Sequence, residues 1–183
     1  LRMIGTHTDI SARKAAEARD AARAQVMMQI ATGESLSLIL ESIVRDLESR
    51  GDWRCSILLV DPSGSSLVVG AAPSLPERFI HGFDGMSIAS EEVPCVAALR
   101  TGARVVCEDT SADPRWPRWR SLAEQAGVRA CWAEPIRSAE GAVIGALANY
   151  HAQPRVPSSP EIHAVLQAAQ VASIAIERKR SEQ

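Results

Sequence analysis

Two apolar stretches that double back on themselves constrain the fold of this chain most strongly. Cys55–Val60 is a short apolar run, an Asp-Pro-Ser-Gly turn follows it, and Leu67–Ala72 is the returning run. Ala130–Arg137 and Ala142–Tyr150 repeat the arrangement around a Ser-Ala-Glu-Gly turn. Runs joined by such short turns pair as antiparallel strands. The sequence therefore predicts two β-hairpins.

Amphipathic helices are expected on both sides of the hairpins. Apolar residues recur at helical spacing before Gly51, and again after a cap formed by Ser158 or Ser159 with Glu161 in the first turn. The two stripes are Leu36, Ile39, Leu40, Ile43 and Leu47, and then Ile162, Val165, Leu166, Ala169, Ala172 and Ile176. Between the hairpins we expect short helices over Pro76–Phe83, over Val93–Arg100 and from about Trp119, and a strand over Val105–Glu108. This alternation favours an α+β fold around an antiparallel sheet.

The N-terminal stretch Ala12–Ala31 is rich in alanine and contains no glycine or proline, which predicts a helix. Its charges have both signs and are expected on a solvated face: Arg13, Lys14, Glu17, Arg19, Asp20 and Arg23. The apolar side is mostly alanine until Val26, so this helix buries little surface alone and needs a partner helix. Gly33 ends or kinks it, and Leu1–Thr8 before it is β-like.

The charge balance excludes some partners. The 183 residues carry 20 Lys and Arg against 22 Asp and Glu, a formal net charge of −2, whereas nucleic acids and anionic membranes select a surplus of basic residues. No apolar run approaches the ~20 residues that span a bilayer. The four cysteines, at positions 55, 95, 107 and 131, have no Cys-x-x-Cys spacing. We therefore expect reduced thiols in a cytoplasmic protein.

Several ordered segments between Leu36 and Ile176 resemble a GAF domain. They are Cys55–Asp61, Gly70–Pro76, Asp109 with Asp113–Trp116, Gly127–Trp132, Pro135-Ile136, Gly141 and Gly145. The resemblance implies a sheet of about six antiparallel strands. The N- and C-terminal helices would pack on one face of it, and a ligand pocket would lie on the other face under short helices and loops.

A second resemblance concerns the N-terminus. Leu1–Ser11, followed by Arg13-Lys14, is similar to the closing strand and exit motif of a PAS domain. The two resemblances divide the chain into a PAS remnant (1–11), a linker helix (12–33), the GAF domain (34–176) and the start of a linker to an output domain (177–183). They imply an interior module of a bacterial multidomain signalling protein.

The GAF resemblance also implies a set of ligand-pocket residues. The candidates are Phe79, Phe83, Cys95, Ala98, Asp109, Trp119, Trp132 and Glu134. Strand alternation places Trp132 and Glu134 on one face, where the carboxylate is either a rim group or a polar anchor in an apolar pocket. Related domains carry Gly-Ser-Cys-Gly-Thr-Ala before the pocket helix, but residues 93–98 here are Val-Pro-Cys-Val-Ala-Ala. Without those glycines, the turn offers fewer amide groups to a phosphate.

Enzymatic and cofactor-binding branches of the family fit this chain poorly. The free methionine sulfoxide reductases need a cysteine in the interval between Asp109 and Ala130, and this chain has none there. Bilin-binding domains use a Cys-His pair, whereas Trp132 follows Cys131. A single histidine such as His81 could hold a haem, but nothing in the sequence requires a cofactor, and the histidines have no metal-ligand spacing. We therefore predict no catalytic residue and no metal site.

Two functions remain open at this point. The first is a regulatory sensor that binds an unidentified small molecule and signals to a downstream kinase, diguanylate cyclase or phosphodiesterase. The second is a ligand-free dimerisation and transmission module. In either case the resemblance implies a homodimer formed by the end helices, with neither nucleic acid nor membrane as a partner of this fragment. The candidate dimer contacts are Val26, Met27, Ile30, Val171 and Ile174.

Overall fold

An antiparallel sheet forms the centre of the computed structural model, which describes residues 6–89 and 93–182. Within that part of the chain the sheet has five strands in the order β2-β1-β5-β4-β3. The strands are β1 (Arg54–Val60), β2 (Leu67–Ala71), β3 (Val105–Cys107), β4 (Ala130–Arg137) and β5 (Val143–His151). The α+β prediction is confirmed, with five strands where about six were expected.

Both predicted hairpins are present, and local chemistry explains their turns. The Asp61 carboxylate accepts hydrogen bonds from the amide groups of Ser65 (2.9 Å) and Ser66 (3.0 Å) between β1 and β2. Between β4 and β5, Gly141 has a φ of +86°, a conformation that favours glycine. β5 also pairs with β1, so the two hairpins lie side by side in one sheet.

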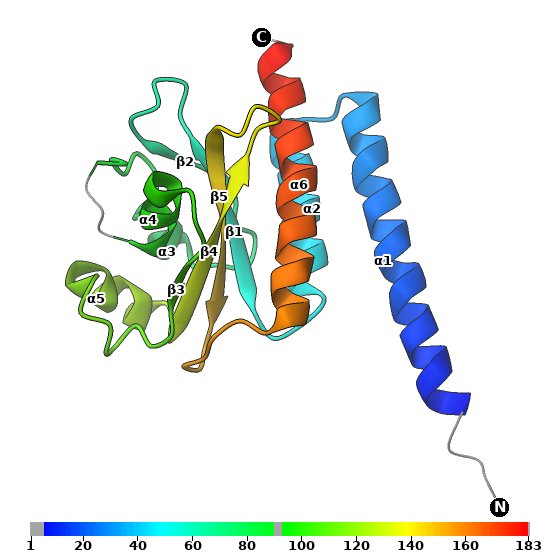
Figure 1. Cartoon of the computed structure of the whole chain (residues 1–183), viewed down its shortest axis with the longest axis horizontal. Coiled ribbons are helices and arrows are strands. Elements are labelled where there is room, and N and C mark those ends of the chain that lie inside the picture. Colours follow the sequence, from blue (N-terminus) through cyan, green and yellow to red (C-terminus); the bar gives the residue numbers. More distant parts are fainter. Residues whose placement is uncertain (1–5, 90–92, 183) are drawn as a thin grey trace, which may run out of the picture.

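Two long helices, α2 (Leu36–Glu48) and α6 (Ser159–Ser181), cover one face of the sheet (Figure 1). The Glu161 carboxylate accepts hydrogen bonds from the amide and the hydroxyl of Ser158, each at 2.7 Å, so the predicted start of the C-terminal helix is confirmed. The core between these helices and the sheet contains Leu40, Val44, Leu47, Ile57, Trp132, Leu147, Val165 and Ile176.

Three short helices cover the opposite face: α3 (Glu77–His81), α4 (Pro94–Thr101) and α5 (Pro117–Gln125) (Figure 1). Two of them begin at a proline, a residue suited to the first turn of a helix. The core on this side includes Leu58, Phe79, Phe83, Val96, Trp119, Cys131 and Tyr150.

Helix α1 (Thr6–Thr32) lies outside the α2–α6 pair (Figure 1). It reaches the core only through Val26 and Ile30, near its C-terminal end, and Gly33 at φ +76° ends it. The β-like conformation expected for Leu1–Thr8 is wrong at residues 6–8, because no glycine or proline interrupts the helix after Gly5. Residues 1–5, the remainder of that prediction, lie outside the described part of the chain.

Among residues 6–89 and 93–182, none of the helices combines the length and the hydrophobicity that a membrane span requires.

Candidate functional site

Five of the predicted pocket residues do come together, on the short-helix face. Phe79, Phe83, Cys95, Ala98 and Trp119 belong to one buried cluster. The ring of Phe79 meets Phe83 edge-on at 5.1 Å between centroids, and meets Tyr150 in the same way at 5.3 Å. These side chains fill the space between the sheet and the three short helices. The structure therefore shows this part of the predicted pocket as packed core.

Asp109 lies at the margin of that face, in the loop after β3. Its carboxylate accepts hydrogen bonds from the hydroxyl (2.7 Å) and amide (2.9 Å) of Ser111 and lies 3.2 Å from Arg129. The Ser111 hydrogen bonds and the Arg129 charge lower the pKa of Asp109 below its ordinary value. Asp109 is thus an ionised group that stabilises its own loop.

Trp132 and Glu134 lie on the other face, the one covered by α2 and α6. Trp132 packs against Trp53, with 6.5 Å between ring centroids. The Glu134 carboxylate pairs with the Arg104 guanidinium at 2.6 Å, and that guanidinium also lies 5.8 Å from the Trp132 ring centroid. The structure does not bring these two residues to the predicted pocket. Alternation correctly put them on one face, but it does not say which face the long helices cover.

A surface hollow opens beside this packed core, between α4 and β3. It has a volume of about 560 Å³ and is lined by Ala97, Arg100, Thr101, Val105, Arg115 and Trp116. The Arg115 guanidinium lies 4.0 Å from the Trp116 ring centroid and is held by the Asp113 carboxylate at 2.5 Å. Trp116 itself is buried in the core and so anchors its loop. Among the described residues, this hollow is a recess on the short-helix side of the sheet.

All four cysteines are free and buried. Burial raises the pKa of Cys95 to about 12, and burial together with the neighbouring Asp113 carboxylate raises the pKa of Cys107 to about 12. A thiol must ionise before it can attack, so burial disfavours the reactive thiolate form of these residues.

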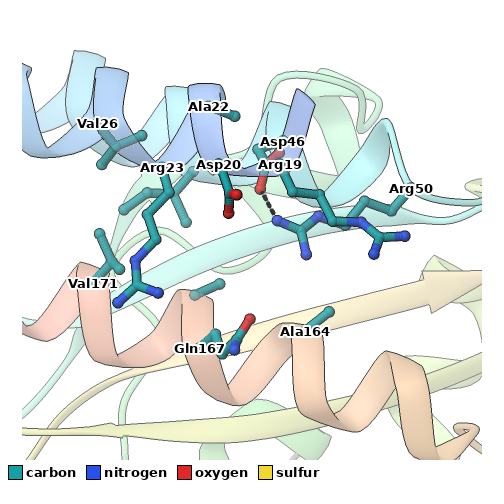
Figure 2. Close-up of a pocket in the computed structure, with 12 residues that line it drawn as sticks. Arg19, Asp20, Ala22, Arg23, Val26, Asp46, Arg50, Ala164, Gln167 and Val171 are labelled. Atoms are coloured by element: carbon teal, nitrogen blue, oxygen red, sulfur yellow. Dashed lines mark hydrogen bonds and ion pairs between the residues drawn. The ribbon is translucent and has the colours of Figure 1, made fainter. Parts of the chain in front are cut away.

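A second recess, which the sequence analysis did not predict, lies between α1, α2 and α6 (Figure 2). This helix cleft has a volume of about 170 Å³. It is lined by Arg19, Asp20, Ala22, Arg23 and Val26 of α1, by Ile43 and Asp46 of α2 with Arg50 just beyond it, and by Ala164, Gln167, Ala168 and Val171 of α6. The expected solvated face of the first helix therefore turns part of its charge toward the rest of the domain, because of where α1 docks.

The last turns of α6 connect several elements. Ser173 donates a hydrogen bond to the Arg137 carbonyl at the end of β4 (2.6 Å), and Glu177 accepts one from the Ala139 amide in the next turn (3.0 Å). Arg178 donates to the carbonyls of Ile30 and Ala31 at the end of α1. Arg180 donates to the Val60 carbonyl at the end of β1 (2.9 Å). We call Ser173, Glu177, Arg178 and Arg180 the α6 junction.

Within residues 6–89 and 93–182, no three His, Cys, Asp or Glu side chains lie close enough together to bind a metal ion. His81 lies on the surface of α3, 3.4 Å from Glu77 on the same helix.

In a comparison of the sequence with protein families, the model for the GAF domain matches residues 33–177, a range that begins just before α2 and ends within α6. This chain belongs to the GAF domain family. GAF domains are sensor modules of signalling proteins. A curated relative, the methyl sulfide methyltransferase-associated sensor of Methanosarcina acetivorans, is 33% identical over 174 residues. That alignment covers 94% of this chain and 17% of the relative, so the chain spans only a small part of the relative's length.

Solved structures share the fold at lower identity. The GAF domain of a phosphoenolpyruvate-protein phosphotransferase from Coxiella burnetii aligns with a TM-score of 0.70 at 16% identity, over 90% of this chain and 95% of that one. Free methionine-R-sulfoxide reductase from Neisseria meningitidis aligns with a TM-score of 0.67 at 20% identity, over 93% and 94% of the two chains. At such identities the likeness concerns the fold alone.

Proposed function

We propose that this GAF domain is a sensor-and-relay module of a longer signalling protein. It would bind a small molecule on the short-helix side of the sheet and pass a conformational change to its end helices. The observation that carries this proposal is the α6 junction, since four neighbouring residues of one helix hold α1, β1 and the β4–β5 turn.

The path of the signal follows from strand pairing. The hollow between α4 and β3 lies at the edge of the sheet, and β3 pairs directly with β4. A ligand that displaces β3 therefore acts on β4, whose far end is held by Ser173. Because Arg178, little more than one turn further along α6, joins this helix to the end of α1, both terminal helices would move together.

The identity of the output stays a prediction from family resemblance: a kinase, a diguanylate cyclase or a phosphodiesterase. The same holds for the cytoplasmic location and for the upstream PAS remnant over residues 1–11. The curated relative is named a sensor, which supports a sensory role for this chain.

The sensor proposal is tested with a panel of cyclic nucleotides, amino acids and haem. We expect one compound to raise the melting temperature of the domain and to appear as a bound mass in native mass spectrometry. Spin labels at Ala24→Cys on α1 and Gln170→Cys on α6 should then report a changed interhelix distance.

The Arg178→Gln variant should keep compound binding but lose that distance change. Lys179→Gln is the matched control, because the ion pair of Lys179 in the described part of the chain is with Glu182, the C-cap residue of the same helix. If no compound in the panel binds, the sensor proposal fails in favour of the ligand-free alternative.

The alternative, a ligand-free dimerisation module, is favoured by one observation. Large apolar side chains remain exposed on the terminal helices: Met27 (41%) and Met28 (63%) on α1, and Leu166 (40%) and Ile174 (48%) on α6. Of the predicted dimer contacts, Met27 and Ile174 are therefore available to a second chain, whereas Val26, Ile30 and Val171 already pack within this one. Light scattering tests this reading: the unmodified chain should have a dimeric mass and Met28→Glu with Ile174→Glu a monomeric one.

A further inference from the structure

The charges of the helix cleft do not cancel. The Arg50 guanidinium is paired with the Asp46 carboxylate, the contact drawn as a dashed line in Figure 2. Among the described residues, no hydrogen bond or ion pair joins Arg19 or Arg23 to any other group, and Asp20 is the remaining carboxylate of the lining. Two guanidinium groups against one carboxylate leave the cleft with one positive charge in excess.

The floor of the cleft is apolar. Val26 of α1 and Ile43 of α2 are buried, and Ala164, Ala168 and Val171 of α6 add aliphatic groups beside the polar Gln167. Figure 2 shows the Arg23 side chain reaching from α1 across the cleft toward Val171 and Gln167 of α6. A guanidinium above an aliphatic floor suits a ligand that has an anionic group at one end and a hydrocarbon body at the other.

The size and the charge narrow the ligand class. A volume of about 170 Å³ lies below the 300–1,000 Å³ typical of sites for drug-sized molecules, so the occupant is small. A dianion such as phosphate would bring two charges to a site with one positive charge in excess, beside the carboxylates of Asp20 and Asp46. A monoanion matches the excess charge.

We propose that the helix cleft binds a short aliphatic monocarboxylate. Arg19 and Arg23 hold its carboxylate, and its hydrocarbon body rests on Val26, Ala168 and Val171. This site lies on the opposite side of the sheet from the hollow beside α4. The two binding proposals can therefore be tested independently of each other.

Occupancy of the cleft has a structural consequence. The ligand would join the middle of α1, through Arg19 and Arg23, to α6. Among the described residues, no hydrogen bond or ion pair links these two arginines to α6. A ligand that binds better when α1 is docked shifts the population toward that position. Binding of a small acid in the cleft would thus determine the orientation of α1 relative to the rest of the domain.

The test uses isovalerate as the probe and its neutral analogue isovaleramide as the chemical control. Binding of each compound is monitored by the amide chemical shifts of the protein in two-dimensional NMR spectra. We expect saturable shifts confined to residues 19–26, 43–50 and 164–171 with isovalerate, and at least about tenfold weaker binding of isovaleramide. The Arg19→Gln/Arg23→Gln variant should bind isovalerate about tenfold more weakly. Arg13→Gln is the matched control, because Arg13 lies on the same helix outside the cleft and pairs with Glu17 at 2.8 Å; its binding should be unchanged.

Several results would overturn the proposal. Absence of saturable shifts at tens of millimolar isovalerate would do so, as would equal binding of isovaleramide. Equal losses of isovalerate affinity in the Arg13→Gln and Arg19→Gln/Arg23→Gln proteins would show that only the total positive charge of the helix matters, and not a site in the cleft. Tighter binding of inorganic phosphate than of isovalerate would reject the ligand class. The comparison of isovalerate with isovaleramide uses the unmodified protein and so does not depend on how well a variant folds.

Discussion

The two faces of the sheet are both buried, but they are covered in different ways. On one face, α2 and α6 have 13 and 23 residues. On the other face, α3, α4 and α5 have 5, 8 and 9 residues. Helices of so few turns have little stability of their own, so their positions depend on the side chains beneath them. The short-helix face therefore relies on its aromatic core, whereas the long-helix face also relies on the capping box of α6 and on the α6 junction.

Each face also buries one polar pair from β1 and β5. On the short-helix face the hydroxyls of Ser56 and Tyr150 are 2.9 Å apart, and burial raises the pKa of Tyr150 well above its ordinary value. On the long-helix face the Cys55 thiol donates to the Asn149 side-chain carbonyl at 3.2 Å. Buried polar groups need partners, so both pairs help to fix the register between these two strands.

The largest expected effect is on the short-helix face. Phe79 is the one buried residue of α3, and its ring contacts Phe83 and Tyr150. Phe79→Ala should lower the free energy of unfolding by about 3–5 kcal/mol, because it removes the side chain that holds this helix in place. Urea denaturation measures the change. Arg78→Ala, at an exposed position of the same helix, should stay within about 0.5 kcal/mol of the unmodified protein. A loss below about 1 kcal/mol at Phe79 would contradict the dependence of this face on its aromatic core.

A smaller loss is expected on the long-helix face, at the Arg104–Glu134 pair. Glu134→Gln should lower the free energy of unfolding by about 1–3 kcal/mol, since the partly buried Arg104 guanidinium loses a charged hydrogen-bond acceptor at 2.6 Å. A double-mutant cycle with Arg104→Gln isolates the interaction between the two side chains. Additive losses in that cycle would show that the pair is not coupled.

The third prediction concerns the side-chain cap of α6, a feature that α3, α4 and α5 lack at their N-termini. Ser158→Ala should cost about 1 kcal/mol in unfolding free energy, because the Glu161 carboxylate loses the hydroxyl donor at 2.7 Å. Burial alone would raise the pKa of Glu161, but the Ser158 hydrogen bonds and the Arg155 charge bring it below its ordinary value. This contribution is present above the ordinary pKa of Glu161 and is lost as the pH falls through the lowered one. Thermal unfolding of both proteins across acidic pH measures it; an equal difference at every pH would contradict the role of the ionised carboxylate.

The smallest effect concerns the β1–β2 turn at the edge of the sheet. Hydrogen bonds from Ser63, Ser65 and Ser66 lower the pKa of Asp61 from 3.8 to about 2. The ordering of this turn should therefore be complete above pH 3.8 and be lost as the pH falls toward 2. Carboxyl chemical shifts in an NMR titration report the pKa directly. Asp61→Asn should remove the dependence of the Ser65 and Ser66 amide shifts on pH in this range, and an ordinary pKa for Asp61 would refute the assignment.

Local patterns in the sequence were enough for much of the fold. The two hairpins, α2, and α6 with its cap each depend on residues that are close together in the chain, such as Asp61 with its serines or Ser158 with Glu161. The family could also be identified from the sequence, because the segments that resemble it are local and occur in the expected order along the chain. The same local rules placed Trp132 and Glu134 on one face of β4.

What the tertiary structure alone decided is how those pieces face one another. Alternation along a strand has a period of two and gives relative sides only, so the passage of α6 over the sheet determined that Trp132 meets Trp53 and not the short helices. Likewise, the charge pattern of α1 is that of a solvated helix until its docking at Val26 and Ile30 turns Arg19 and Arg23 toward α6. Contacts such as Arg178 with Ile30 join residues far apart in the sequence, and no local pattern encodes them because they exist only once the helices have packed.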